Sequence, residues 1–287
     1  MKTLYESILN DIEDTIKDGD KKAEEYSIRN FIEKNYEILP VNYGDISNPI
    51  KITNVNGVYE VTINGRINII NKSLKKLTDG TFRFKIVNGI FDISDSNIET
   101  LENGPEIVNS FYATNCTKLK SLQYCPKCVD YIFEISGCTG INNLKYMPER
   151  IGSLIDISGC TISSLRGISK VEIMDLAGLC LICKNCNNLK DLPGCHKKTT
   201  TLICSDCENL ETFKGCPSIT AFNGQYSVDC SNCPKLMPIG LPKKLNNGIN
   251  IKGCPLIKKE DIRKAGCVTV KPVSCDPSQE TINYRYR

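Results

Sequence analysis

Apolar residues at the start of the chain recur at helical spacing. Four large aliphatic side chains lie four positions apart, at Leu4, Ile8, Ile12 and Ile16. Tyr5 and Leu9 widen the stripe that these residues form. The spacing predicts an amphipathic helix over residues 1–17, which Asp18-Gly19-Asp20 is expected to end.

A second helix is predicted from about Lys21 to Ile38, with Ile28 and Ile32 on its apolar side. Pro40 follows this segment and cannot continue a helix. Residues 1–40 are therefore expected to form an N-terminal helical segment.

Residues 41–85 have a different pattern, because apolar and polar positions alternate from Ile50 onward. That period predicts strands. Asn64-Gly65 is typical of a two-residue hairpin turn, so a hairpin is expected between residues 58–63 and 67–69. We expect this region to be a small β cap for the part of the chain that follows.

The next part of the chain repeats one unit about every 20 to 28 residues. Each unit has a short alternating segment, then two aliphatic residues three positions apart, then a Cys-Pro-like corner. The alternating segments are Phe91-Asp92-Ile93, Phe111-Tyr112-Ala113, Phe133-Glu134-Ile135, Ile155-Asp156-Ile157, Met174-Asp175-Leu176, Leu181-Ile182-Cys183, Leu202-Ile203-Cys204, Val228-Asp229-Cys230 and Ile249-Asn250-Ile251. One unit cannot bury its own apolar side, so stacked copies with one continuous core are expected.

The predicted fold class is an α/β repeat, namely an irregular leucine-rich-repeat-like solenoid of short parallel strands. An N-terminal helical segment and a small β cap precede it. The predicted solenoid covers residues 86–268, and residues 269–287 form a C-terminal tail.

The chain has 17 cysteines, and most of them are in phase with the repeat. One equivalent position, just after the strand, holds Cys116, Cys138, Cys160, Cys186, Cys207, Cys233 and Cys254. This is the Asn/Cys position of leucine-rich repeats, where a small buried side chain fits a tight turn. The pattern predicts a structural ladder of buried thiols.

Zinc is the alternative interpretation of these cysteines. Cys183-x-x-Cys186 and Cys204-x-x-Cys207 are separated by 17 residues, a spacing found in zinc ribbons. Both pairs are in repeat phase, however, and other units keep only the second cysteine. The structural ladder is therefore the favoured interpretation, and no metal ion or cofactor is expected.

Composition excludes several function classes. The 36 basic and 33 acidic residues give a net charge of only +3, which makes a nucleic-acid partner an unfavoured prediction. The acids gathered by residue 14 argue against a secretory signal, and no apolar run predicts membrane insertion. His196 is the single histidine, and Cys195-His196 are adjacent without an orienting acid, so the chain is not expected to be an enzyme.

The central residue of each alternating segment is expected to face outward, because side chains alternate across a strand. This outward row is rich in acids and gives the predicted partner-binding residues Asp92, Tyr112, Glu134, Asp156, Asp175 and Asp229. The stripe of Leu4, Ile8, Ile12 and Ile16 is the second predicted docking element. A polar row that only keeps the sheet in solution is the alternative interpretation.

The opening Met1-Lys2-Thr3-Leu4-Tyr5-Glu6-Ser7-Ile8-Leu9, followed by units of the form x-L-x-x-L-x-x-C-P, resembles leucine-rich-repeat-like proteins of tailed bacteriophages of gut bacteria, crAss-like phages included. The resemblance covers residues 1–17 and 86–268. It implies a phage origin and a place in the cytoplasm of the infected host or in the virion. It implies no catalytic residues.

The predicted function is a non-enzymatic protein–protein interaction module with a phage or host protein as partner, and an oligomer or larger assembly is possible. The alternative is a structural virion subunit attached through its N-terminal helix. A zinc-binding or thiol enzyme, using Cys183, Cys186, Cys204 and Cys207 in the zinc case, ranks last.

Overall fold

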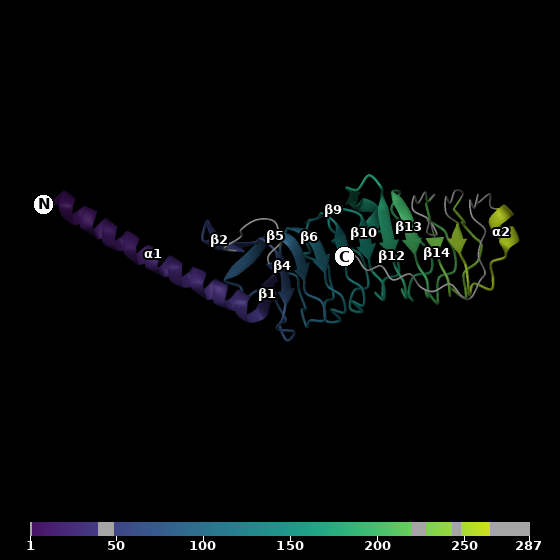
Figure 1. Ribbon diagram of the computed structural model, residues 1–287, viewed down its shortest axis with the longest axis horizontal. Helices are drawn as coiled ribbons and strands as arrows, with labels where there is room; N and C mark the ends of the chain where they lie inside the picture. The colour runs from purple at the N-terminus through teal and green to yellow at the C-terminus, as the bar shows by residue number, and fades with distance from the viewer. Residues whose placement is uncertain (1, 40–48, 218, 220–227, 243–247, 265–287) are drawn as a thin grey trace.

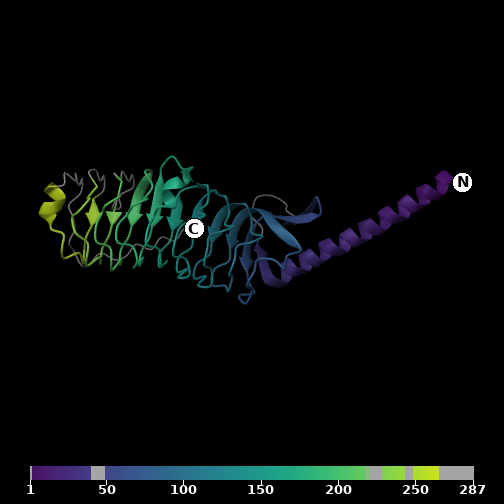
Figure 2. The ribbon, with the colours of Figure 1, turned by 180° about the vertical axis from the view of Figure 1, so that it is seen from behind.

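In the computed structural model the chain forms a long parallel β-solenoid, and one helix projects from its N-terminal end (Figure 1, Figure 2). The structure describes residues 2–39, 49–217, 219, 228–242 and 248–264, with side chains from residue 17 onward. Pro40 and the predicted tail 269–287 lie outside the described residues.

The N-terminal segment is one continuous helix, α1 (Lys2–Asn35), so the predicted break at Asp18-Gly19-Asp20 is wrong. A helical glycine costs only about 1 kcal/mol relative to alanine, which a long helix can tolerate. Lys22 also forms an ion pair of 2.6 Å with Asp18, one turn away, across the glycine. This contact lowers the pKa of the Asp18 carboxyl.

The second predicted helix was expected to reach Ile38, and this is also wrong. The helix ends at Asn35, and the next residues form strand β1 (Tyr36–Leu39). Asn35 is buried, and its carbonyl accepts hydrogen bonds from the amides of Ile70 and Asn71. The chain therefore turns at Asn35 and pairs antiparallel with the strand that precedes Ile70.

The last turns of α1 cap the solenoid. Ile28 and Ile32 are buried in the same core as the coils, and the Tyr36 hydroxyl donates a hydrogen bond of 2.6 Å to the carbonyl of Leu77. The rest of the helix extends away from the body (Figure 1).

The β cap contains β2 (Ile50–Val55), β3 (Val58–Ile63) and β4 (Arg66–Ile69), followed by the long β5 (Phe82–Asp92). The hairpin lies between β2 and β3, at Asn56 and Gly57, which both have a positive φ. The hairpin predicted at Asn64-Gly65 is wrong, because β3 and β4 both pair in parallel with β5. β5 also crosses the expected boundary between residues 85 and 86, so cap and coils share one sheet.

Two parallel ladders run along the solenoid. The main one continues from β5 through β6 (Ile107–Tyr112), β8 (Ile132–Glu134), β10 (Leu154–Asp156), β12 (Leu179–Ile182), β13 (Thr199–Ile203), β14 (Val228–Asp229) and β15 (Ile249–Asn250). A shorter ladder starts on β6 and contains β7 (Cys128–Val129), β9 (Arg150–Ile151) and β11 (Glu172–Ile173). Apart from α1, the described helices are the 3-10 turn η1 (Ile168–Lys170) and α2 (Lys259–Lys264), which covers the C-terminal end with Ile262.

The inward residues of the main ladder form the core. They are Phe91, Phe111, Phe133, Ile155, Leu181, Leu202, Val228 and Ile249, in register from strand to strand. Phe111 stacks between Phe91 and Phe133, with ring centroids 6.1 and 5.5 Å away. The predicted solenoid with one continuous core is confirmed.

Each coil leaves its strand through a tight turn. The turn residue has a φ between 54° and 75° and is Asp95, Asn115, Gly137, Gly159, Asn185, Asp206, Asn232 or Gly253. Asn, Asp and Gly are the residues that adopt this left-handed conformation most readily. The next residue is the buried ladder cysteine, or Ser96 in the first coil.

The buried cysteine ladder is confirmed, and it is also a ladder of hydrogen bonds. Each of the seven predicted thiols donates to a backbone carbonyl of the preceding coil, at Sγ–O distances of 2.8 to 3.3 Å. Burial raises the pKa of Cys160 and of Cys207 to about 12, so these thiols keep the proton that they donate. A cysteine here is thus both small enough for the turn and able to bond the neighbouring coil.

Substitutions of Cys138 test this role. We expect Cys138→Leu to lower the free energy of unfolding by about 1–3 kcal/mol, because the fully buried turn has no room for it. Cys138→Ala should cost less, and Cys138→Ser least, because a hydroxyl can still donate to the Ala113 carbonyl. Chemical denaturation under reducing conditions measures the order; equal values for all three variants would contradict it.

Candidate binding surface

The outward residues of the main ladder form a central row on the sheet face. In register, this row is Asp92, Tyr112, Glu134, Asp156, Ile182, Ile203, Asp229 and Asn250. Five of the six predicted partner-binding residues therefore share a row. Asp175 does not: it lies in the turn between β11 and β12, and Ile182 takes its place.

The aspartates of this row accept a backbone hydrogen bond in the turn that follows each strand. The amides of Ser94, Ser158 and Ser231 donate to Oδ1 of the aspartates two residues earlier, at 3.0, 2.9 and 2.9 Å. Asn250 accepts the same bond from Lys252, and Asp175 accepts it from Ala177. Because a neutral Asn does the same, turn formation accounts for the recurring Asp, and the row alone is weak support for a basic partner.

The charges of the row are not continuous. Arg66 forms an ion pair of 3.0 Å with Asp92, and Tyr112 separates this pair from Glu134. Glu134 and Asp156 are direct neighbours on β8 and β10. Burial raises the pKa of the Asp156 carboxyl, and the Glu134 charge adds to the increase.

Asp156→Asn should raise the free energy of unfolding at neutral pH by a few tenths to about 1 kcal/mol, because it removes the charge opposite Glu134. Its amide oxygen can still accept from Ser158, as Asn250 does from Lys252. Since the folded chain holds the Asp156 proton more tightly than the unfolded chain, wild-type stability falls as the pH rises through the folded pKa. The advantage of Asn should therefore shrink as the pH is lowered.

Chemical denaturation at several pH values measures this effect, with Asp229→Asn as the control. Asp229 lies between Ile203 and Asn250 and faces no acid in its row, so its substitution should change stability little. A loss of stability in Asp156→Asn would show that the charge itself is needed.

The apolar residues beside the central row are the feature that the sequence analysis missed. The outward row beside the central one contains Ile132, Leu154 and Cys180, in register on β8, β10 and β12. Together with Ile182 and Ile203 they form a partly exposed apolar patch from β8 to β13. Ile132, Leu154 and Cys180 lie two positions before the central residue of their strands. The triplets used to define the repeat begin only one position before the central residue, so they did not include them.

The described helices leave this face open. α1 and α2 lie at the two ends of the solenoid, not over the strands (Figure 1). Glu134 and Asp156 border the apolar patch on the same strands as Ile132 and Leu154. Ser136 and Ser158 follow them on the outward side, and Ser136 donates to the Glu134 carboxylate at 2.8 Å.

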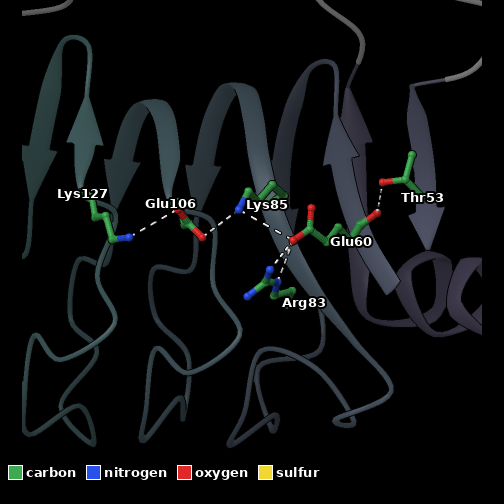
Figure 3. Close-up of polar contacts among 6 residues, drawn as sticks. All are labelled: Thr53, Glu60, Arg83, Lys85, Glu106 and Lys127. Carbon is green, nitrogen blue, oxygen red and sulfur yellow. Dashed lines mark hydrogen bonds and ion pairs between the residues drawn. The ribbon is translucent and has the colours of Figure 1, made fainter. Parts of the chain in front are cut away.

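A second group of charges, at the junction of cap and coils, is internally paired. Figure 3 shows Glu60 bound by Arg83 and Lys85, and Glu106 bound by Lys85 at 3.0 Å and Lys127 at 3.4 Å. Lys85 lowers the pKa of Glu106. Glu106 and Lys127 immediately precede β6 and β7. Alternating signs on successive coils stabilise their register, so this charge ladder is a structural feature.

The cysteines of the zinc alternative are part of the core. Cys183, Cys186, Cys204 and Cys207 are buried on two neighbouring coils, and Cys186 and Cys207 donate to backbone carbonyls. Within the described ranges, no three His, Cys, Asp or Glu side chains are arranged to hold a metal ion. The geometry favours the structural ladder over zinc.

Cys195 and His196 do not form a nucleophile–base pair in their described contacts. The Cys195 thiol lies 3.5 Å from the Thr199 hydroxyl, and burial raises its pKa to about 11. His196 Nδ1 instead accepts the amide hydrogen of Lys198 at 3.0 Å. A thiol that keeps its proton is a poor nucleophile.

The predicted docking residues Leu4, Ile8, Ile12 and Ile16 lie on the backbone of α1, but their side chains are outside the described residues. Among the described helices, none is both long and apolar enough to span a bilayer.

Comparison with known proteins gave no relative: no protein-family model, no curated protein and no solved structure matches the chain. Its function has to be inferred from its own surfaces.

Proposed function

We propose that the chain is a non-enzymatic binding module whose sheet face binds another protein. The observation that carries this proposal is the apolar patch of Ile132, Leu154, Cys180, Ile182 and Ile203 on the outward side of the sheet. An origin in a phage, which the resemblance implies, stays a prediction.

The inward row of the strands supplies the core, so residues on the outward side could be polar at no cost to it. In this patch, five neighbouring outward positions are apolar instead. Grouped apolar side chains on an open face mark interaction sites more often than scattered ones do. The parallel strands hold the five side chains on a rigid surface, and a rigid surface lowers the entropy lost on binding.

The border of the patch indicates the chemistry of the partner. Glu134 and Asp156 are available to basic groups or hydrogen-bond donors beside an apolar contact, and they disfavour a nucleic-acid backbone. A basic group placed near Asp156 would also offset the repulsion from Glu134. The partner that fits is a protein segment with apolar side chains flanked by Lys or Arg.

Two matched variants test the proposal. Leu154→Lys/Ile182→Lys places two charges in the patch, and Leu176→Lys/Ile239→Lys makes the same change at exposed aliphatic residues elsewhere. Proteins that the wild type captures from a cell extract should bind the second variant with the same affinity. The first should bind them at least about tenfold more weakly, since burying a charge opposes association.

Hydrogen exchange of the complex locates the interface. Protection should increase on β8, β10, β12 and β13 when the partner binds. Equal affinity of the two double variants, or protection confined to other elements, would overturn the proposed surface. Unchanged circular dichroism of both variants excludes misfolding as the cause.

A further inference from the structure

Because α1 is continuous, it has one stripe of apolar and small residues that two separate helices would not have, and we call this stripe the seam. Along one face, apolar or small residues recur at alternating steps of four and three: Tyr5, Leu9, Ile12, Ile16, Gly19, Ala23 and Tyr26. Steps of this kind repeat every 3.5 residues on average, which is the spacing of a left-handed coiled coil. Gly19 belongs to this seam, whereas the sequence analysis assigned it to a helix end.

The seam faces away from the solenoid. At 3.6 residues per turn, it lies roughly 170° around the helix from Ile28 and Ile32, which pack into the body. Glu24, on the body side, shares a hydrogen bond with Tyr59. Ala23 and Tyr26, on the seam, are exposed, and Tyr26 is 74% exposed.

The projecting part of α1 needs a partner to be stable. From Lys2 to Ala23 it extends away from the body as a single rod (Figure 1, Figure 2). An isolated helix of this length is marginal in water, and this one contains Gly19 and several Asp, Asn, Ser and Thr residues with low helix propensity. A second helix along the seam would bury the apolar stripe.

The charges beside the seam favour another copy of this chain in parallel. The positions that flank the seam on one side are Glu6, Glu13 and Asp20, and those on the other side are Ile8, Thr15 and Lys22. An antiparallel pair would place the acidic side of one helix against the same side of the other. A parallel pair instead places Glu13 opposite Ile8 and Asp20 opposite Thr15 of the other helix, so no acid of the seam border faces another acid.

We propose that α1 associates with α1 of a second copy in a parallel coiled coil. Both solenoids then leave the coiled coil at the same end, so that two sheet faces are presented together. Two linked binding faces strengthen attachment to a partner that displays repeated sites, because the second contact is intramolecular.

Light scattering on the eluted peak of the full chain tests the proposal with two triple variants. Leu9→Lys/Ile12→Lys/Ile16→Lys alters the seam, and Thr3→Lys/Ser7→Lys/Asn10→Lys adds the same charge to the opposite face. We expect the wild type and the second variant to have at least twice the 32.0 kDa mass of one chain. The seam variant should be a monomer with an intact solenoid by circular dichroism.

Orientation is tested by mild oxidation of Leu9→Cys, with Asn10→Cys as the control on the opposite face. Parallel pairing brings the two introduced thiols of Leu9→Cys together and gives a disulfide-linked dimer that Asn10→Cys does not form. A monomeric wild type, or a seam variant that stays associated, would overturn self-association and leave a different protein as the occupant of the seam. Oligomers of wild type without the Leu9→Cys cross-link would overturn the parallel arrangement. None of these results depends on the sheet-face partner.

Discussion

Phe111→Ala should lower the free energy of unfolding by about 3–5 kcal/mol, one of the two largest effects expected of a single substitution in this chain. The ring is fully buried on β6 and stacks on Phe91 and Phe133 at interplanar angles of 27° and 23°. Truncation leaves a cavity between two coils, and both neighbouring coils lose a contact. In a solenoid these neighbour contacts provide most of the stability.

Guanidinium unfolding followed by far-ultraviolet circular dichroism is the appropriate measurement, because the chain contains no Trp. Phe111→Leu is the matched control and should cost much less, since Ile155 shows that an aliphatic residue fits the same row. Hydrogen exchange should become faster on β5 and β8 than on β14 and β15. A cost below about 1 kcal/mol would mean that the ring is not a core contact.

The repeat could be predicted because its signals are local and periodic. The inward row, the aliphatic pair and the cysteine position recur at nearly constant spacing, so one unit predicts the next. The ladder cysteines were assigned correctly because no metal site requires unpaired members such as Cys116 and Cys254 at the same position. Their hydrogen bonds to carbonyls of the preceding coil depend on the distance between coils, which the sequence does not contain.

The incorrect predictions share one cause: a local signal was overridden by pairing with distant residues. Asn64-Gly65 is a good hairpin turn, yet β3 and β4 both pair with β5, about one full coil away in the sequence. Ile38 continues a helical pattern, yet it lies in strand β1, which pairs antiparallel with β4. Asp175 repeats the Asp of the central row because it caps a turn of the same kind outside that row.

The candidate site was predicted in part. Alternation correctly placed Glu134 and Asp156 outward, but it did not show that the recurring Asp of this row also accepts the amide hydrogen bond at the end of its strand. The apolar patch became visible only when the register aligned Ile132, Leu154 and Cys180. Insertions of a few residues before β12 hide that alignment in the sequence.

The close approach of successive coils gives the second large effect. Gly152 lies at the corner between β9 and β10, and its amide donates to the carbonyl of Val129 in the preceding coil at 2.9 Å. A Cβ atom at Gly152 would overlap the carbonyl of Asp130 and lie 2.8 Å from the Cα atom of Tyr131. Both contacts are with backbone, which cannot move aside as a side chain can.

Gly152→Ala should therefore lower the free energy of unfolding by about 3 kcal/mol, the upper end of the usual cost of overpacking. The added methyl group separates two coils and weakens the bond from Gly152 to Val129, so exchange of the amides in β9 and β10 should become faster. Gly19→Ala makes the same chemical change where no other part of the same chain lies within 4 Å, and it should instead stabilise α1 by up to about 1 kcal/mol. Denaturation and hydrogen exchange of both variants separate steric overlap from backbone entropy. Replacing Gly by Ala restricts the unfolded chain at both positions and so favours folding, which means that a loss of stability at residue 152 reports the overlap. If Gly152→Ala is as stable as the wild type, successive coils are farther apart at this corner than the structure places them, and the corner has room for a side chain.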